Sequence, residues 1–364
     1  MKNIIDYAKN ELRTFNEKKF NSIDSLILSQ ISYIVLDGLV NNIDGTSEAI
    51  TFKDLLKAEF FYKMFNTIPY SKSTKELLFH ISANPRFRDI KINYYISKID
   101  KFSEKQFSAT TFILDNTYAY VAFRGTDYSI VGWKEDFNMA FITPIPSQLE
   151  GVKYLNTIAK LIPHRLYVGG HSKGGNIAVY ASMNCEPDTL ERIEVIFSHD
   201  GPGFRADIIE SNNFKKIQNK INKTIPYSSL IGMFLENHEE YNIVKSNKFS
   251  GLKQHDPFSW EIKNSDFIYL EKISQSSKYT YKALHKWLSE VDNEKRKIFI
   301  DALFSIFTST KEENFIEISK NLREYMPLMI YSIKNMDKEI KSLIIKFIKE
   351  FTSLYIKVAT HIEK

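Results

Sequence analysis

The strongest local signal in this chain is the stretch YVGGHSKGGNIAVY, Tyr167–Tyr180. It places Gly170 two residues before Ser172 and Gly174 two residues after it. A serine nucleophile projects from a sharp strand-to-helix turn, where a side chain at either glycine position would collide with neighbouring backbone. The G-x-S-x-G motif therefore predicts a nucleophile elbow with Ser172 at its tip.

The residues on either side of the motif supply the elements that an elbow requires. Arg165–Val168 is a short apolar run that predicts a strand, and Asn176–Met183 follows with helical spacing. Amides at the start of this helix, near Lys173, favour the negative charge of a tetrahedral intermediate. The alternative is a glycine turn that cradles a phosphate, but the chain lacks both the P-loop spacing and the dinucleotide-binding fingerprint.

The fold class follows from the order of the other elements. Ser108–Leu114 and Thr117–Phe123 are rich in β-forming residues and are separated by Asp115-Asn116, which predicts a hairpin. A further strand is expected at Glu194–Ser198. Strands that alternate with helices at this spacing predict an α/β fold whose central sheet is mostly parallel.

Helices are expected before these strands. Apolar residues recur with helical spacing from Ser25 to Ile34, and Asp24 is expected to be the N-cap. A second helix is expected over Thr51–Phe65, opened by a capping motif at Thr51-Phe52-Lys53-Asp54.

From about Tyr279 the strand signals stop and helical spacing takes over, as in Ile298–Phe304 and Ile344–Phe351. We therefore predict two parts: an α/β domain with the N-terminal helices over residues 1–278, and a C-terminal helical region over residues 279–364. The lysine-bearing last helix fits packing against the rest of the protein or contact with a membrane surface.

Composition excludes several classes of protein. With 43% hydrophobic and 26% charged residues, the chain of 364 residues is typical of a globular protein, and its net charge of +5 is too small to indicate nucleic-acid binding. The single cysteine, Cys185, excludes an internal disulfide and a multi-cysteine zinc site. The N-terminus has no apolar central region, and no uncharged run approaches the span of a bilayer. We expect a cytoplasmic protein.

A serine nucleophile needs a base, and the eight histidines differ in their settings. His255 lies in a late loop, Gly251–Phe258, where hydrolases of this type place the base. His171 adjoins Ser172, but neighbouring side chains at a turn diverge, so we expect it to line or support the site. The others lie in helical stretches, before the nucleophile strand, beside Asp200 or in a charged run: His80, His164, His199, His238, His285 and His361.

The acid has several candidates. Asp200 follows the first strand after the elbow, at the carboxyl end where catalytic groups of α/β sheets collect. Its setting, Asp200-Gly201-Pro202-Gly203, equally fits a structural turn. Glu236, Glu239 and Asp256 are alternatives.

At this point the chain resembles a known group, the class 3 or fungal-type lipases of the α/β-hydrolase fold, and more closely a bacterial family of Mbeg-like hydrolases. The resemblance spans roughly Asp24 to Trp260. It rests on five phrases in order: Phe123-Arg124-Gly125-Thr126-Asp127, Gly132-Trp133-Lys134-Glu135-Asp136-Phe137-Asn138, Gly170-His171-Ser172-Lys173-Gly174-Gly175-Asn176, Asp200-Gly201-Pro202-Gly203-Phe204 and Gln254-His255-Asp256-Pro257-Phe258.

The resemblance implies an α/β-hydrolase fold with Ser172 as nucleophile and His255 as base. It implies that the backbone amide of Thr126 completes an oxyanion hole with the amide of Lys173, and that Asp127–Asn138 lies where lipases begin a lid. The chain departs from the lipase pattern at the acid, because Ile225–Gly232 contains no carboxylate. The departure leaves two alternatives, Asp200 as the acid or a Ser-His dyad.

The substrate side is open to two interpretations. His171, Asp127 and Trp133 are candidate substrate-binding residues. The dense charged and aromatic cluster Trp133–Asn138 alternatively pins its loop through salt bridges, and Arg124 is expected to pair internally.

Together these features predict a serine hydrolase that cleaves carboxylic esters, including lipid esters because apolar residues crowd Ile130–Trp133 and Leu230–Phe234. No metal or organic cofactor is implied, and the oligomeric state is left open. An amidase or thioesterase is an alternative of the same class. Two alternatives come from other classes: a non-catalytic hydrolase-fold binding or scaffold protein, and a peripheral membrane protein attached through its last helix.

Overall fold

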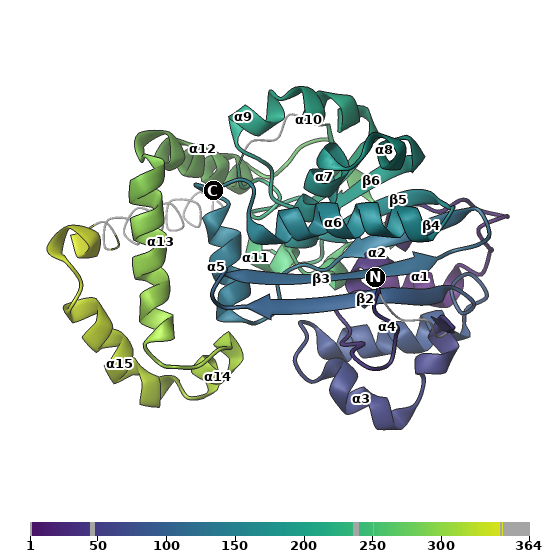
Figure 1. The fold of residues 1–364 in the computed structure, drawn as a ribbon, viewed down its shortest axis with the longest axis horizontal. Helices are drawn as coiled ribbons and strands as arrows, with labels where there is room; N and C mark the ends of the chain where they lie inside the picture. Colours follow the sequence, from purple (N-terminus) through teal and green to yellow (C-terminus); the bar gives the residue numbers. More distant parts are fainter. Residues whose placement is uncertain (1, 44–47, 236–239, 250, 343, 345–364) are drawn as a thin grey trace.

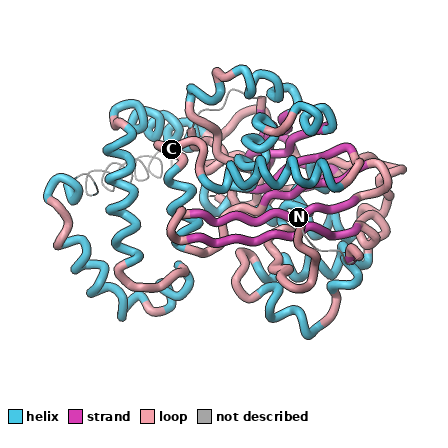
Figure 2. Tube along the Cα trace, in the orientation of Figure 1, coloured by secondary structure: helices cyan, strands magenta, loops and turns pink. Residues whose placement is uncertain are grey.

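The computed structural model describes residues 2–43, 48–235, 240–249, 251–342 and 344. A nine-stranded sheet runs through the middle of the main body, with helices on both of its faces (Figures 1 and 2). Its strands lie in the order β1 (Ile50–Thr51), β2 (Lys91–Asp100), β3 (Lys105–Ile113), β4 (Tyr118–Phe123), β5 (Arg165–His171), β6 (Ile193–His199), β7 (Ile221–Pro226), β8 (Tyr241–Val244) and β11 (Tyr269–Leu270).

The central strands of this sheet are parallel. Strands β4 to β8 pair in parallel with their neighbours, whereas β1, β2, β3 and β11 join antiparallel at the two edges. The predicted hairpin is β3–β4, in which Ile113 pairs with Ala119 and Ala109 with Phe123. The mostly parallel sheet and the hairpin are thus confirmed, and a small hairpin, β9 (Ile262–Lys263) and β10 (Asp266–Phe267), lies outside the sheet.

The period of two along β4 explains how the sheet is covered on both faces. Tyr120 and Ala122 are buried in the apolar cluster of the N-terminal helices, whereas Ala119, Val121 and Phe123 are buried in a second cluster on the opposite face. The second cluster includes α6 (Pro146–Leu161), α7 (Lys173–Asn184) and α10 (Asn212–Ile217), with α8 (Pro187–Arg192) and α9 (Ala206–Ile209) nearby.

The N-terminal face is covered by α1 (Ile4–Asn10), α2 (Ser22–Ile31), α3 (Ala58–Phe65) and α4 (Ser71–Ala83). The predicted N-cap of α2 was wrong: Asn21 caps the helix, and Asp24 is the third residue of its first turn. The Asp24 carboxylate accepts a hydrogen bond from the Asn21 amide at 2.9 Å. Its carboxylate is otherwise occupied by Arg86, whose guanidinium donates to it at 2.5 and 2.8 Å in the buried core.

The predicted continuous helix over Thr51–Phe65 is broken. Thr51 ends β1, Phe52–Leu55 forms a short 3-10 helix, and α3 begins only at Ala58. Phe52 and Leu55 are buried, and the Phe52 ring stacks on Phe112 of β3 at a centroid distance of 5.7 Å. Packing of Phe52 and Leu55 into the core therefore overrides the helical pattern. The predicted capping bond is present, with the Thr51 amide donating to the Asp54 carboxylate.

The C-terminal helical region comprises α12 (Gln275–Glu290), α13 (Asn293–Thr308), α14 (Phe315–Lys320) and α15 (Leu322–Lys334) in the described part of the chain. It lies beside α5 (Ile130–Asn138), away from the N-terminal helices (Figure 1). The architecture is therefore an α/β-hydrolase fold with N-terminal helices and an appended helical region. Division of the chain at residue 278 stays a prediction, and the predicted helix over residues 344–351 lies outside the described residues. None of the described helices has the length and apolar character to cross a membrane.

Candidate active site

The elbow predicted at Ser172 is present. Strand β5 ends at His171, α7 begins at Lys173, and Ser172 between them has φ 59° and ψ −133°. A serine in this sparsely populated region of backbone conformation is strained, as a nucleophile on a sharp strand-to-helix turn is expected to be. The Ser172 amide donates to the carbonyl of His199 at 3.0 Å. Its hydroxyl makes no hydrogen bond to any residue that the structure describes, so it is available to a substrate.

Close backbone contacts bring the end of β4 against the elbow. A Cβ atom on Gly174 would lie 2.1 Å from the carbonyl oxygen of Phe123, and one on Gly170 would lie 2.3 Å from the carbonyl carbon of Gly174. A Cβ atom on Gly125 would lie 2.6 Å from the carbonyl oxygen of His171. Only glycine fits these approaches, and they place Thr126, the residue after Gly125, next to the turn that carries the serine.

Thr126 and Lys173 are the predicted oxyanion donors. Neither backbone amide donates a hydrogen bond within the described residues, whereas most buried amides do. The Thr126 side chain makes a separate contact, in which its hydroxyl donates to Asp136 Oδ2 at 2.5 Å. Asp136 therefore fixes the orientation of Thr126.

The side chain of Lys173 forms a buried ion pair that the sequence did not reveal. Its Nζ atom lies 2.9 Å from Glu135 Oε2, and both side chains are fully buried. The Glu135 carboxylate also accepts bonds from the Ser147 hydroxyl at 2.7 Å and from the amide of Gln106 at 3.0 Å. These contacts join the start of α7 to α5, α6 and β3.

Asp136 lies at the edge of this ion pair. Its Oδ1 atom is 3.8 Å from Lys173 Nζ and accepts no hydrogen bond from any of the described residues. Burial raises the pKa of Asp136 to about 6, against the lowering effect of the Lys173 cation and of the bond from Thr126. At neutral pH the carboxylate is thus ionised but poorly solvated.

His255 is held in place by its neighbour Gln254. Gln254 Oε1 accepts a bond from the Ser228 amide at 2.6 Å, and its carbonyl accepts the indole N–H of Trp260 at 2.9 Å. The His255 ring then lies against the ring of His171, with centroids 4.5 Å apart. Since His171 precedes Ser172, the late loop brings the predicted base to the elbow.

Asp200 is the carboxylate that contacts the base. It follows β6, with φ 48°, and its Oδ2 atom lies 2.6 Å from His255 Nδ1. Its Oδ1 atom accepts bonds from the Ser229 hydroxyl at 2.5 Å and from the Gly232 amide at 3.0 Å. The segment 225–232 lacks a carboxylate of its own, but it supplies two hydrogen-bond donors to the carboxylate of Asp200.

Two buried histidines beneath the site are neutral. Burial, reinforced by the neighbouring His255 and His199, lowers the pKa of His171 well below 6.5. Its Nε2–H donates to the carbonyl of His255 at 3.0 Å. Burial lowers the pKa of His199 to about 3, and its Nε2 lies 2.9 Å from the Ser25 hydroxyl. His171 therefore supports the loop of the base and adds no competing positive charge.

The residues just before α1 bind the segment that follows the predicted base, His255. The side chain of Asn3 donates to the carbonyl of Phe258 at 3.0 Å, and the amide of Ile262 donates to the carbonyl of Lys2 at 2.8 Å. The two ends of the hydrolase part thus meet next to His255.

The predicted substrate-binding side chains make contacts within the protein. Asp127 pairs with Arg124 at 3.2 Å and accepts a bond from the Ser129 amide at 2.9 Å. The Trp133 ring packs edge-on against Phe315 at 6.1 Å. The internal pairing of Arg124 is confirmed, and Lys134 makes salt bridges as the pinning interpretation predicts. Contact of His171, Asp127 or Trp133 with substrate stays a prediction.

Of the other acid candidates, the structure describes Asp256. Asp256 accepts a bond from the Phe258 amide at 2.9 Å and caps the short helix that begins at Pro257. Glu236 and Glu239, with His238, lie outside the described residues. Among the described carboxylates, Asp200 is the one hydrogen-bonded to His255.

Sequence reasoning missed the positioning contacts of Glu135, Asp136 and Ser229. Glu135 and Asp136 belong to one charged run in the sequence, although helical spacing places both on the side of α5 opposite Ile130. That periodicity was the available signal. Ser229 had none, because its partner is 29 residues away in the chain.

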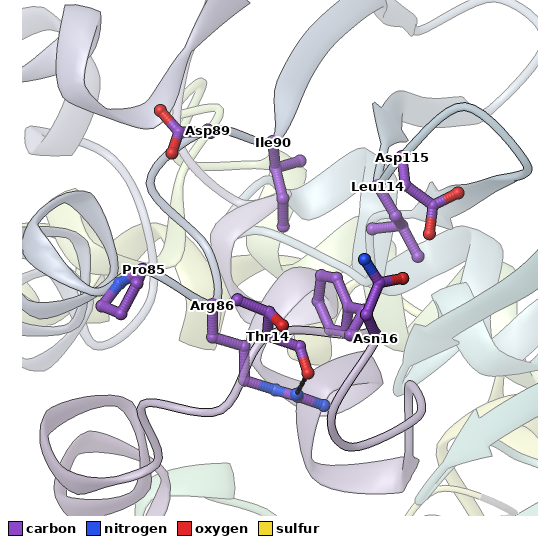
Figure 3. Close-up of a pocket in the computed structure, with 9 residues that line it drawn as sticks. Thr14, Asn16, Pro85, Arg86, Asp89, Ile90, Leu114 and Asp115 are labelled. Carbon is purple, nitrogen blue, oxygen red and sulfur yellow. Dashed lines mark hydrogen bonds between the residues drawn. The ribbon is translucent and has the colours of Figure 1, made fainter.

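A pocket lies at the opposite end of the sheet (Figure 3). Its wall includes Leu114 and Asp115, which precede β4, whereas Thr126 follows the carboxyl end of that strand. Arg86 in this wall directs its donors to Asp24 and to carbonyl groups of residues 13, 14, 18 and 19. The pocket is therefore separate from the elbow. The described residues contain no histidine, cysteine or acidic cluster of metal-binding geometry.

Comparison with known proteins gives one family match. A sequence profile described as Mbeg1-like matches residues 81–305, more than half of the chain. No curated protein sequence matches. Similar solved structures include a fungal lipase–inhibitor complex (15% identity, TM-score 0.38, 75% of this chain and 87% of that one), the Lip2 lipase of Yarrowia lipolytica (12%, 0.32, 60% and 75%) and the M37 lipase (14%, 0.35, 57% and 68%).

Proposed function

This chain belongs to the Mbeg1-like family, and we propose that it is a serine hydrolase that cleaves carboxylic esters through an acyl-enzyme intermediate. The observation that carries the proposal is the 2.6 Å contact between Asp200 Oδ2 and His255 Nδ1, made by a ring that lies against the residue before Ser172. A serine on an elbow, an imidazole and a buried carboxylate are the components of a catalytic triad, and the contact between the imidazole and the carboxylate supports the proposal.

In the proposed reaction, Ser172 Oγ attacks the ester carbonyl carbon while His255 Nε2 takes the hydroxyl proton. The carbonyl oxygen becomes an oxyanion, which the amides of Thr126 and Lys173 stabilise. The bond to the leaving alcohol then breaks, and that alcohol receives the proton from His255. Water repeats the sequence on the acyl-enzyme and releases the acid. Asp200 keeps the proton on Nδ1, so that Nε2 is the basic nitrogen.

The apolar stretches that suggested a lipid substrate are largely part of the protein core. Ile130 and Met233, from the apolar stretches near the site, are buried in core clusters and pack against other protein side chains. Carboxylic esters are therefore the proposed substrate class, and lipid esters are one member of it for the test.

The proposal is tested with a fluorophosphonate probe, which labels activated serines. We expect the wild type to be labelled, Ser172→Ala to be unlabelled and His255→Ala to react slowly. Ser103→Ala, in an exposed turn, is the control and should react like the wild type. An ester panel of increasing acyl length then defines the substrate. Labelling that survives Ser172→Ala would show that another residue is the nucleophile, whereas a wild type that neither reacts nor hydrolyses any ester would favour the scaffold alternative.

A further inference from the structure

Helix α5 presents two faces with different partners. Ile130, Trp133, Lys134 and Phe137 recur at helical spacing and form one stripe, which we call the outer face. Glu135 and Asp136 project from the other side, the inner face. A helix of nine residues is too short to be stable alone, so its position depends on what packs against these faces.

The backbone at the start of α5 is joined to the C-terminal helical region. The amide of Ile130 donates to the carbonyl of Glu313 at 2.9 Å, and the amide of Phe315 donates to the carbonyl of Tyr128 at 3.0 Å. Ser129 and Asn314 form the isolated β-bridge between them. Two chain segments about 185 residues apart are thus paired immediately after Thr126 and Asp127.

Side chains of the outer face continue this contact. Lys134 lies 2.7 Å from Asp301 of α13 and 2.7 Å from Glu104 in the β2–β3 turn. The Phe137 ring packs edge-on against Phe304 of α13, at a centroid distance of 5.5 Å. Further along, the Arg296 guanidinium donates to the carbonyl of Ala140 at 2.8 Å. The C-terminal helical region therefore holds the outer face through one ion pair, aromatic contacts and backbone bonds, and Glu104 adds a second ion pair.

The inner face holds both predicted oxyanion residues. Asp136 accepts the Thr126 hydroxyl at 2.5 Å, and Glu135 accepts Lys173 Nζ at 2.9 Å. Any shift of α5 would move these two acids together, and with them the segments that carry the Thr126 and Lys173 amides.

We propose that the C-terminal helical region positions the oxyanion hole by fixing α5, with Asp301 and Phe315 as positioning residues. The inference rests on the proposed hydrolase function for its catalytic consequence. It assigns a purpose to α13 and α14 beyond stability: without their contacts the amide of Thr126 would be held less accurately where the oxyanion forms, and accuracy at this position controls rate.

Two variants remove the contacts while leaving the helices intact. Asp301→Asn deletes the charge that faces Lys134. Phe315→Pro removes the N–H that binds Tyr128 and the ring that packs on Trp133. Phe315 is the first residue of α14, a position that accepts proline, and the extended backbone of Asn314 (φ −137°, ψ 130°) suits the residue before a proline. Glu317→Gln is the control, because it removes an exposed ion pair with Lys320 inside the same region.

The assay is ester hydrolysis per active site, with sites counted by fluorophosphonate titration so that unfolded protein is not included. We expect kcat to fall about ten- to hundredfold in Asp301→Asn/Phe315→Pro, with KM within about twofold of the wild type. Hydrogen exchange in peptides covering residues 124–138 should become faster. Glu317→Gln should change neither quantity.

Unchanged kcat per site in the double variant, or an equal loss in Glu317→Gln, would overturn the inference. If the wild type hydrolyses no ester, the proposed function fails separately, and hydrogen exchange alone then decides the coupling. Exchange over residues 124–138 that is the same in the double variant and the wild type would refute it.

Discussion

The Ser229 hydroxyl donates to Asp200 Oδ1 at 2.5 Å, while the other oxygen of the same carboxylate contacts His255 at 2.6 Å. A Cβ atom on Gly232 would lie 2.3 Å from that Oδ1, so the backbone there must be glycine for its amide to reach the carboxylate. The Ser229 hydroxyl and the Gly232 amide thus hold Oδ1 of Asp200. This fixes the direction in which Oδ2 faces the imidazole of His255.

Asp200→Asn should lower kcat by about 10³- to 10⁴-fold, because an amide in this position favours the wrong tautomer of His255. Steady-state hydrolysis of the best ester is the measurement. Asp256→Asn is the matched control, since Asp256 caps a short helix, and it should retain kcat within a few-fold. Full activity in Asp200→Asn would indicate a Ser-His dyad, and a large loss in Asp256→Asn alone would identify that residue as the acid.

Gly174→Ala should destabilise the protein severely. The new Cβ would lie 2.1 Å from the carbonyl oxygen of Phe123, and both partners are backbone that cannot rotate away. We expect a loss of more than about 4 kcal/mol in the free energy of unfolding, measured with urea. Gly151→Ala is the comparison, because its Cβ would meet a side-chain atom, Cγ2 of Ile177, at 2.6 Å rather than backbone, so we expect a smaller loss. Equal losses in the two variants would contradict the backbone argument.

Lys173→Met removes the side-chain cation of residue 173 and keeps its backbone amide. It leaves the Glu135 carboxylate buried without its cation, which should cost about 3–5 kcal/mol of the free energy of unfolding. The amide of residue 173 is retained but loses its link to Glu135 of α5, so kcat per titrated site should fall as well if α5 positions the oxyanion hole. Adding Glu135→Gln should recover part of the stability. Failure of the second substitution to recover any would show that the buried charge is not the source of the loss.

His199→Gln should change how stability depends on pH. Burial lowers the pKa of His199 to about 3, so the folded protein keeps it neutral while the unfolded chain takes up a proton below about 6.5. Stability is therefore lost as the pH falls from about 6.5 towards 3. At pH 5 the neutral His199 should lower the free energy of unfolding by about 2 kcal/mol relative to pH 7. Urea unfolding at both pH values is the measurement, and the loss between pH 7 and pH 5 should be smaller by about this amount in the variant. An unchanged difference would mean that His199 is not the titrating group.

The elements with strong local patterns were predictable from the sequence. The elbow at Ser172 and the β3–β4 hairpin both depend on residues close together in the chain, where spacing and turn chemistry suffice. The N-cap of α2 was wrong by three residues, because Asn21 is the cap and Asp24 closes its capping box, a pattern that Asn and Asp at this spacing leave open. The Thr51–Phe65 helix was wrong for a different reason, since the distant contact between Phe52 and the sheet decides where the helix begins.

The candidate site shows the same division. Ser172 and His255 follow from motif and loop position, and the structure brings them to one end of the sheet. Asp200 could be nominated but not chosen, because its turn reads equally well as structural, and only the spatial approach of His255 distinguishes the two interpretations. The two faces of α5 were hidden because a sequence does not show that residues near 301 and 315 pack against residues near 130.

The seam between residues 2–3 and residues 258–262 has a consequence for how this protein is made and handled. A nascent chain cannot lock the loop that carries His255 until about residue 262 has left the ribosome, since residues 2–3 bind residues 258 and 262. A tag joined directly before Lys2 would therefore lie against that closure.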